Sequence, residues 1–132
     1  MNFLIAIGLI LIYSRISAQT CGYAYKKEIT FDNSQVSGNS NLEDFPVLIS
    51  VTDNDLRTTG NGGHVENTNG YDIIFADASG TQLDHDLELY VAATGQLVAW
   101  VRIPTLLGTA NTEIYMYYGH CTYSGGDQTT TS

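Results

Sequence analysis

Hydrophobic and polar side chains alternate along most of this chain with a period of two, a pattern typical of half-buried β-strands. The clearest case is LVAWVRI at residues 97–103, which Pro104 follows. Trp100 and Arg102 lie on one side of this stretch, and small aliphatic side chains lie on the other. Because proline donates no backbone hydrogen bond, we expect the strand to end at Pro104. One set of alternating side chains is small and aliphatic, as a buried face requires: Leu97, Ala99, Val101 and Ile103.

Further strands are predicted at residues 25–31, 45–52, 73–75, 83–91 and 113–118. In residues 83–91 the expected inward side chains are Leu83, His85, Leu87, Leu89 and Val91, and the outward ones are Asp84, Asp86, Glu88 and Tyr90. Residues 25–31 include Lys26 and Lys27, and lysines are typical of sheet edges because they discourage pairing with a second molecule. With no amphipathic helix after residue 18, the chain predicts an all-β fold, an antiparallel, jelly-roll-like β-sandwich.

The two ends of the chain differ in composition from its middle. The apolar run at residues 2–13 has the length of a signal-peptide core and is shorter than the about 20 residues of a bilayer span. We therefore predict a signal peptide at 1–18, one domain at 19–123 and a flexible Gly/Ser/Thr tail or linker at 124–132. A buried or membrane-retained helix is the alternative for the first segment. The expected location is secreted or at the cell surface, with the periplasm as a variant.

Cys21 and Cys121 lie near the two ends of the predicted domain. In an oxidising compartment they predict one disulfide, which closes a loop of about 100 residues and contributes about 4–5 kcal/mol in the chain-entropy model. Lipidation of Cys21 is the alternative, although the preceding Gln19-Thr20 does not match a lipidation signal well.

The chain is acidic, with a net charge of −9, and removal of residues 1–18 leaves 14 acidic and four basic residues, a net charge of −10. Such a surface repels nucleic acid and anionic lipid. We expect neither nucleic-acid binding nor membrane insertion of the domain, whereas divalent cations and neutral glycans suit this charge.

Asp84, Asp86 and Glu88 follow one side of a predicted strand, about 6–7 Å apart. Clustered carboxylates predict a calcium site if a neighbouring loop supplies further oxygens. The alternative is a solvated face on which one carboxylate pairs with Arg102 across adjacent strands. Glycoside hydrolases also use two carboxylates at this spacing, but almost any acidic strand has carboxylates at the same spacing.

No other catalytic pattern is present. His64, His85 and His120 lack zinc-ligand spacing, and nucleophile-elbow and phosphate-loop motifs are missing. We therefore expect no enzyme activity, and no cofactor apart from calcium.

Aromatic residues on the outward positions are the most suggestive feature of the sequence. Rings with polar tips on a rigid sheet stack on sugars and hydrogen-bond their hydroxyls. The alternative is that these rings form the core, which would invert the inward and outward assignments. The expected ligand-binding face comprises Tyr90, Trp100, Arg102, Tyr115 and Tyr117.

Six stretches together resemble a bacterial family of domains of unknown function: residues 26–32, 44–49, 71–75, 87–88, 97–101 and 114–119. That family occurs in large secreted and surface proteins, often next to concanavalin-like lectin or laminin-G-like domains. Some members accompany envelope proton-channel proteins of the MotA/TolQ/ExbB type. The resemblance covers about residues 23–120 and implies a β-rich extracellular module.

These observations favour a non-catalytic module of a bacterial surface or secreted protein that binds carbohydrate or mediates adhesion, with a glycan or another surface protein as partner. The alternative is a structural spacer, or a self-assembling envelope or filament subunit without a small-molecule ligand.

Overall fold

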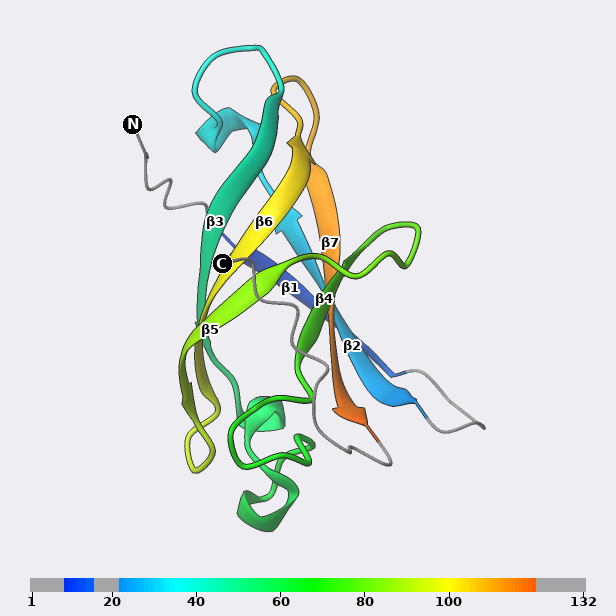
Figure 1. Cartoon of the computed structure of the whole chain (residues 1–132), viewed down its shortest axis with the longest axis vertical. Coiled ribbons are helices and arrows are strands. Elements are labelled where there is room, and N and C mark those ends of the chain that lie inside the picture. The colour runs from blue at the N-terminus through cyan, green and yellow to red at the C-terminus, as the bar shows by residue number, and fades with distance from the viewer. Residues whose placement is uncertain (1–8, 16–21, 121–132) are drawn as a thin grey trace.

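Two antiparallel sheets pack face to face in the computed structural model, which describes residues 9–15 and 22–120 (Figure 1). One sheet has the order β1-β2-β7-β4 and the other β3-β6-β5. Short 3-10 helices lie at Asn33–Gln35, Asn54–Leu56 and Thr59–Asn61. The predicted all-β antiparallel sandwich is confirmed. The strands are β1 (Leu9–Arg15), β2 (Tyr23–Phe31), β3 (Leu42–Thr52), β4 (Ile74–Asp77), β5 (His85–Val91), β6 (Gln96–Leu106) and β7 (Thr112–His120).

A single hydrophobic core fills the space between the sheets. The predicted inward residues of 97–103 are all buried in it, so the inverted assignment with Trp100 in the core is wrong. The other core side chains come from both sheets, as a sandwich requires. Among them are Ile29, Phe31, Val47, Ile49, Phe75, Ile114, Met116 and Tyr118.

Strand β6 passes through Pro104 and ends at Leu106, two residues later than predicted. The Arg102 amide donates to the Asp84 carbonyl, so alternate amides of β6 face the β5 side. Strand β5 itself begins only at His85, opposite Val101. The amide that Pro104 lacks would point to the β5 side, where no strand lies next to position 104. The hydrogen bonds between β6 and β3 are therefore unaffected, and the strand continues.

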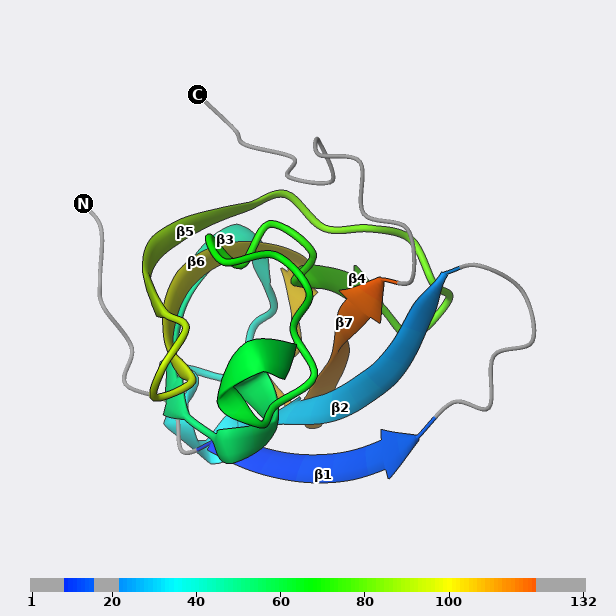
Figure 2. The same ribbon diagram turned by 90° about the horizontal axis from the view of Figure 1, so that it is seen from below.

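Strand β2 lies between β1 and β7, so the expected edge position of residues 25–31 is wrong. Its partner β1 consists of residues that lie inside the predicted signal peptide, and it pairs from Leu9 with Phe31 to Arg15 with Tyr25 (Figure 2). Cleavage after residue 18 stays a prediction. No helix in the described ranges, 9–15 and 22–120, is long and apolar enough to cross a membrane.

The ends of β2 and β7 lie side by side, because Tyr23 pairs with His120. The predicted bridge between Cys21 and Cys121, and the predicted tail at 124–132, lie outside the described residues.

The segment that follows β3 folds tightly against one end of the sandwich (Figure 1). Leu56 and Val65 are fully buried there. Asp72 is also fully buried, and its carboxylate accepts hydrogen bonds from the amides of Glu66 at 2.8 Å and Asn67 at 3.1 Å. Asp53 caps the short helix at Asn54–Leu56, since its carboxylate accepts a hydrogen bond from the Asp55 amide at 2.9 Å.

A β-bulge between Leu87 and Leu89 shifts the register of β5 against β6. One extra residue reverses the alternation, so side chains after it point to the opposite sides. Leu89 was expected inside and is 42 % exposed, whereas Tyr90 was expected outside and packs against the core.

Candidate functional site

Trp100 lies on the outer face of the β3-β6-β5 sheet, and register fixes its neighbours. Leu48 of β3 and Asp86 of β5 are its cross-strand partners, so these three side chains form a row across the sheet. One step along β6, Arg102 has Pro46 on one side and donates to the carboxylate of Asp84 on the other. The predicted pairing of a carboxylate with Arg102 is confirmed. We define the Trp100 face as Pro46, Leu48, Asp84, Asp86, Trp100 and Arg102.

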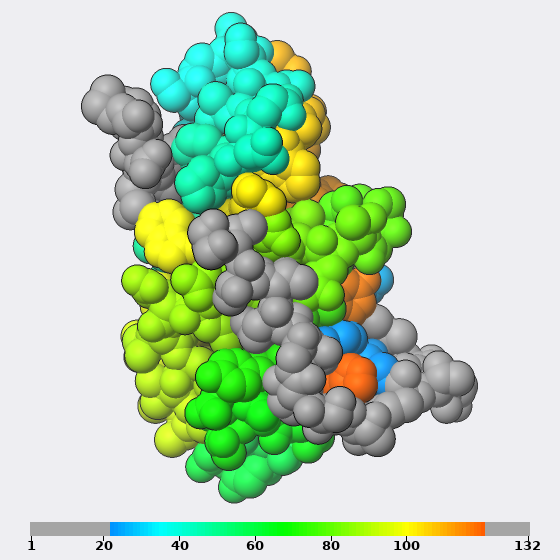
Figure 3. Space-filling view, viewed as in Figure 1, coloured from blue at the N-terminus to red at the C-terminus, as the bar shows by residue number. Residues whose placement is uncertain are grey.

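The Arg102–Asp84 pair positions groups more than it stabilises the fold. Both side chains are exposed to solvent, where an ion pair contributes about 0–1 kcal/mol. The Arg102 amide also donates a hydrogen bond to the Asp84 carbonyl at 2.9 Å, which fixes the backbone of the two segments here. The pair therefore holds a guanidinium next to the indole ring and cancels its charge locally. The surfaces of β5 and β6 adjoin in Figure 3 (yellow-green and yellow).

Tyr115 and Tyr117 lie on the other outer face, that of the β1-β2-β7-β4 sheet. The ammonium group of Lys26 lies 5.1 Å from the centre of the Tyr115 ring, and the Tyr117 ring packs edge-on against Tyr23 at 6.1 Å. Partial burial raises the pKa of Tyr115, and nearby carboxylates add to this shift. The two tyrosines are separated from Trp100 by the whole core.

Tyr90 belongs to neither outer face. Its hydroxyl donates to the Leu56 carbonyl at 2.7 Å, and its ring covers Gly70 so closely that a Cβ there would lie 2.8 Å from the ring. Burial raises the pKa of Tyr90, and the charge of Asp72 adds to the effect. The five predicted ligand-binding residues are thus divided among two opposite faces and the core. Only Trp100 and Arg102 remain together.

The predicted calcium ligands do not converge. Asp84 is occupied by Arg102, and both Asp86 and Glu88 are exposed on a strand that the bulge interrupts. Within residues 9–15 and 22–120, no three acidic, histidine or cysteine side chains are gathered closely enough to hold a metal ion. His85 is a core side chain, and its Nδ1 donates to the Leu83 carbonyl at 3.0 Å in the tautomer that this contact requires.

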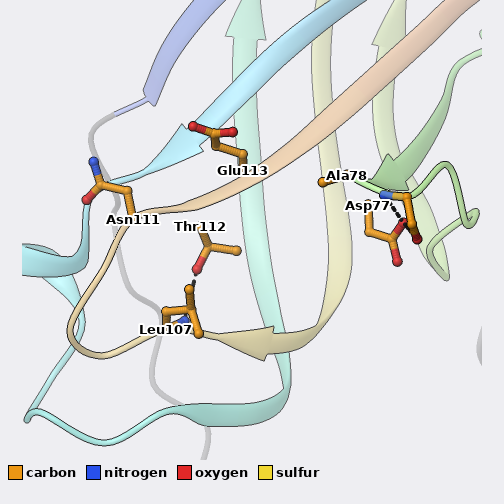
Figure 4. A pocket seen from close by; sticks show the side chains of 7 residues that line it. Asp77, Ala78, Leu107, Asn111, Thr112 and Glu113 are labelled. Atoms are coloured by element: carbon orange, nitrogen blue, oxygen red, sulfur yellow. Dashed lines mark hydrogen bonds between the residues drawn. The ribbon is translucent and has the colours of Figure 1, made fainter.

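A groove of about 550 Å³ opens where β4 and β6 end and β7 begins (Figure 4). Asp77 and Ala78 line one side, and Asn111, Thr112 and Glu113 line the other. A second hollow of about 230 Å³ shares three of these residues and reaches towards the apolar side chains of Leu83, Ile103 and Pro104. No pattern in the sequence predicts this groove, because strand ends and the turns after them come together only in three dimensions.

Sequence reasoning also missed a charge cluster around Lys27. Its side chain is buried, and its ammonium lies 2.8 Å from the Asp53 carboxylate and 3.3 Å from that of Asp55. His64 Nε2 lies 3.8 Å from Asp55, and the His64 ring stacks on Tyr25 at 4.2 Å. The sequence did hold one signal of this cluster: Lys27 stands at every-second-residue spacing with Ile29 and Phe31, which places it on the core side of its strand. The cluster joins β2 to the segment after β3.

Residues 69–132 match the family model described as "Domain of unknown function (DUF2341)". The match runs from the loop before β4 to the end of the sequence, and it confirms the resemblance to a family of domains of unknown function. Comparisons with curated proteins and with solved structures gave no match.

Proposed function

We propose that this chain, whose residues 69–132 belong to a family of domains of unknown function, is a non-catalytic extracellular module that binds carbohydrate at the Trp100 face. The observation that supports this proposal most is the placing of Trp100 between Asp86 and Leu48, with the Arg102–Asp84 pair one step along the same strand. An indole on a rigid sheet stacks on the apolar face of a sugar ring, and flanking charged groups hydrogen-bond its hydroxyls.

Charge favours a neutral glycan over an acidic one. Arg102 is compensated by Asp84, whereas the exposed carboxylate of Asp86 has no hydrogen-bond or ion-pair partner within residues 22–120. The net charge of −9 adds a long-range repulsion of anions. A uronic-acid or sulfated polymer would therefore be repelled at the same surface that attracts an uncharged one.

The test is glycan-array binding of the full chain, with calcium present and with a chelator. Trp100→Ala is the test variant, and the double variant Tyr115→Ala/Tyr117→Ala is the matched control, because it removes aromatic rings from the opposite face. We expect saturable binding that Trp100→Ala abolishes and the double variant retains. Loss of binding only in the double variant would move the site to the other sheet. Unchanged binding in folded Trp100→Ala would refute this site.

The exposed side chain of Leu89 favours a second candidate, self-assembly as a structural subunit. Leu89 pairs with Val98 in the row beside Trp100, so two neighbouring apolar side chains adjoin the indole on this side of the sheet, before Ser50 completes the row. A second copy seated there would bury it. Leu89→Asp should then convert an assembled species to a monomer in sedimentation velocity, whereas a chain that is monomeric at every concentration would exclude this candidate.

We also propose a disulfide between Cys21 and Cys121 as the closure of the domain. The pairing of Tyr23 with His120 supports it, because one of these residues follows Cys21 by two positions and the other directly precedes Cys121. Intact-mass measurement of the oxidised secreted chain, with and without reductant, should show a difference of two hydrogens. Equal masses would exclude the bridge.

A further inference from the structure

We infer that the groove lined by Asp77, Asn111, Thr112 and Glu113 is a second carbohydrate site, one that holds a single neutral sugar unit. No residue that lines the groove belongs to the Trp100 face, so this site stands independently of the first. The inference rests on the polar groups of Asp77, Asn111 and Thr112, because internal hydrogen bonds fix these three side chains.

Asp77 supplies a fixed acceptor. Its Oδ1 accepts hydrogen bonds from the Ser79 amide at 2.9 Å, the Ser79 hydroxyl at 2.7 Å and the Thr81 amide at 2.9 Å. These bonds, that of the Ser79 hydroxyl above all, lower the pKa of Asp77 and keep it ionised. These three hydrogen bonds all use Oδ1, so Oδ2 is the less occupied oxygen of the carboxylate.

Asn111 and Thr112 supply fixed donors on the opposite side. The Asn111 Oδ1 accepts from the Asn33 amide at 3.0 Å, so its Nδ2 group is the end that remains to donate. The Thr112 hydroxyl oxygen accepts from the Leu107 amide at 2.9 Å, which directs its own proton elsewhere (Figure 4). Asp77 thus lies on one side of the groove, and the Asn111 amide and the Thr112 hydroxyl lie on the other (Figure 4).

This combination fits sugar hydroxyls, each of which both donates and accepts. An ammonium ion would pair with the carboxylates of Asp77 and Glu113 but would leave the Asn111 and Thr112 donors to water, whereas sugar hydroxyls can bond to both kinds of group. The lining contains no lysine, arginine or histidine, so an acidic sugar would find no counter-charge. Ala78 and Leu107 offer apolar contact for the C–H groups of a ring, and the volume accommodates a monosaccharide.

The test uses the full chain carrying Trp100→Ala, so that the first site cannot contribute. Saturation-transfer difference NMR would be recorded with glucose, galactose, mannose and N-acetylglucosamine, and with glucuronate as the anionic comparison. We expect saturation transfer to at least one neutral sugar and none to glucuronate. Two isosteric variants keep the internal bonds and reverse the polarity of the free atom: Asn111→Asp and Asp77→Asn. Each should weaken binding about fivefold or more, because Asp77→Asn removes a charged acceptor and Asn111→Asp replaces a donor by a charged acceptor.

Glu28→Gln is the control, since it makes a comparable change on the outer face of β2, outside the groove. No transfer to any neutral sugar by the folded Trp100→Ala chain would overturn the inference, and so would equal affinity of the parent, Asn111→Asp and Asp77→Asn chains. Neither result would touch the proposed function, which fails only if the unmodified chain shows no array binding that depends on Trp100.

Discussion

Replacing Lys27 by Met should destabilise the fold by about 2–3 kcal/mol, although the two side chains have similar length and apolar stems. At 2.8 and 3.3 Å, the two contacts of the ammonium are worth on the order of 5 kcal/mol each at an effective dielectric constant of about 20. Desolvation of the ammonium offsets several kcal/mol of this gain. Removing one member of a fully buried pair costs about 3–5 kcal/mol.

The cost falls below that range because the two carboxylates stay partly hydrated. The Lys27 side chain is 4 % exposed, whereas those of Asp53 and Asp55 are 24 % and 35 % exposed. After Lys27→Met, water therefore solvates the charges that remain. A loss of about 2–3 kcal/mol is still a large share of the 5–15 kcal/mol that stabilise a typical domain.

Urea unfolding followed by far-ultraviolet circular dichroism measures this difference. Lys26→Met is the matched control, because Lys26 is the neighbouring lysine but points outward over a tyrosine ring, where such a contact contributes about 0.5–1 kcal/mol. If Lys27→Met costs no more than Lys26→Met, the reasoning about the buried ion cluster is refuted.

The same variant should change how stability depends on pH. Burial opposes ionisation of Asp53, but hydrogen bonds from Lys27 and the Asp55 amide and the charge of Lys27 together lower the pKa of Asp53 below 3.8. A carboxyl with a lowered folded-state pKa stabilises above its unfolded pKa and loses this contribution as the pH falls through the folded one. Wild-type stability should therefore fall below about pH 4, and this acid-side slope should be shallower in Lys27→Met.

Three further substitutions test other parts of the fold by the same unfolding assay. Gly95→Ala should destabilise the fold strongly, because the backbone there has φ of 72° and a Cβ would lie 1.9 Å from the Asp53 carbonyl oxygen. Gly80→Ala is the comparison: its φ is 88° but the space around it is open, so it should cost only about 1–2 kcal/mol. Asp72→Ala should cost about 2 kcal/mol or more, because the amides of Glu66 and Asn67 lose the buried carboxylate that accepts their hydrogen bonds; a neutral effect would contradict its structural role. Tyr90→Phe should cost about 1 kcal/mol by removing one hydrogen bond, and an alkaline absorbance titration should lose one tyrosine whose pKa is raised.

The alternation of side chains was enough to predict the sandwich, because burial on one face imposes a period of two on every strand. It succeeded for β6, where Leu97 and Val101 are fully buried and Arg102 is exposed. It also placed Lys27 correctly on the side of Ile29. Alternation says only which side a residue faces, so it could not show which carboxylates would meet that lysine.

The predicted binding face failed for two separate physical reasons. A bulge adds one residue to β5, and no pattern in DLELYV marks where the extra residue stands, so the sides of Leu89 and Tyr90 were exchanged. Trp100 and Tyr115 were both assigned correctly as outward, but the chain crosses to the other sheet between β6 and β7. Outward on one sheet and outward on the other are opposite directions.

The groove could not be predicted from the sequence, because it depends on where neighbouring strands stop. It forms because β4 stops at Asp77 and β5 starts only at His85, so the ends of β6 and β7 lack a neighbour beyond these points. Strand lengths, not residue types, create the opening. A longer β4 would fill it: an insertion that extends β4 past Asp77 should close the groove while leaving the Trp100 face intact. Sites built from early strand ends can therefore be found only after topology is known, whereas a face such as that of Trp100 follows from alternation alone.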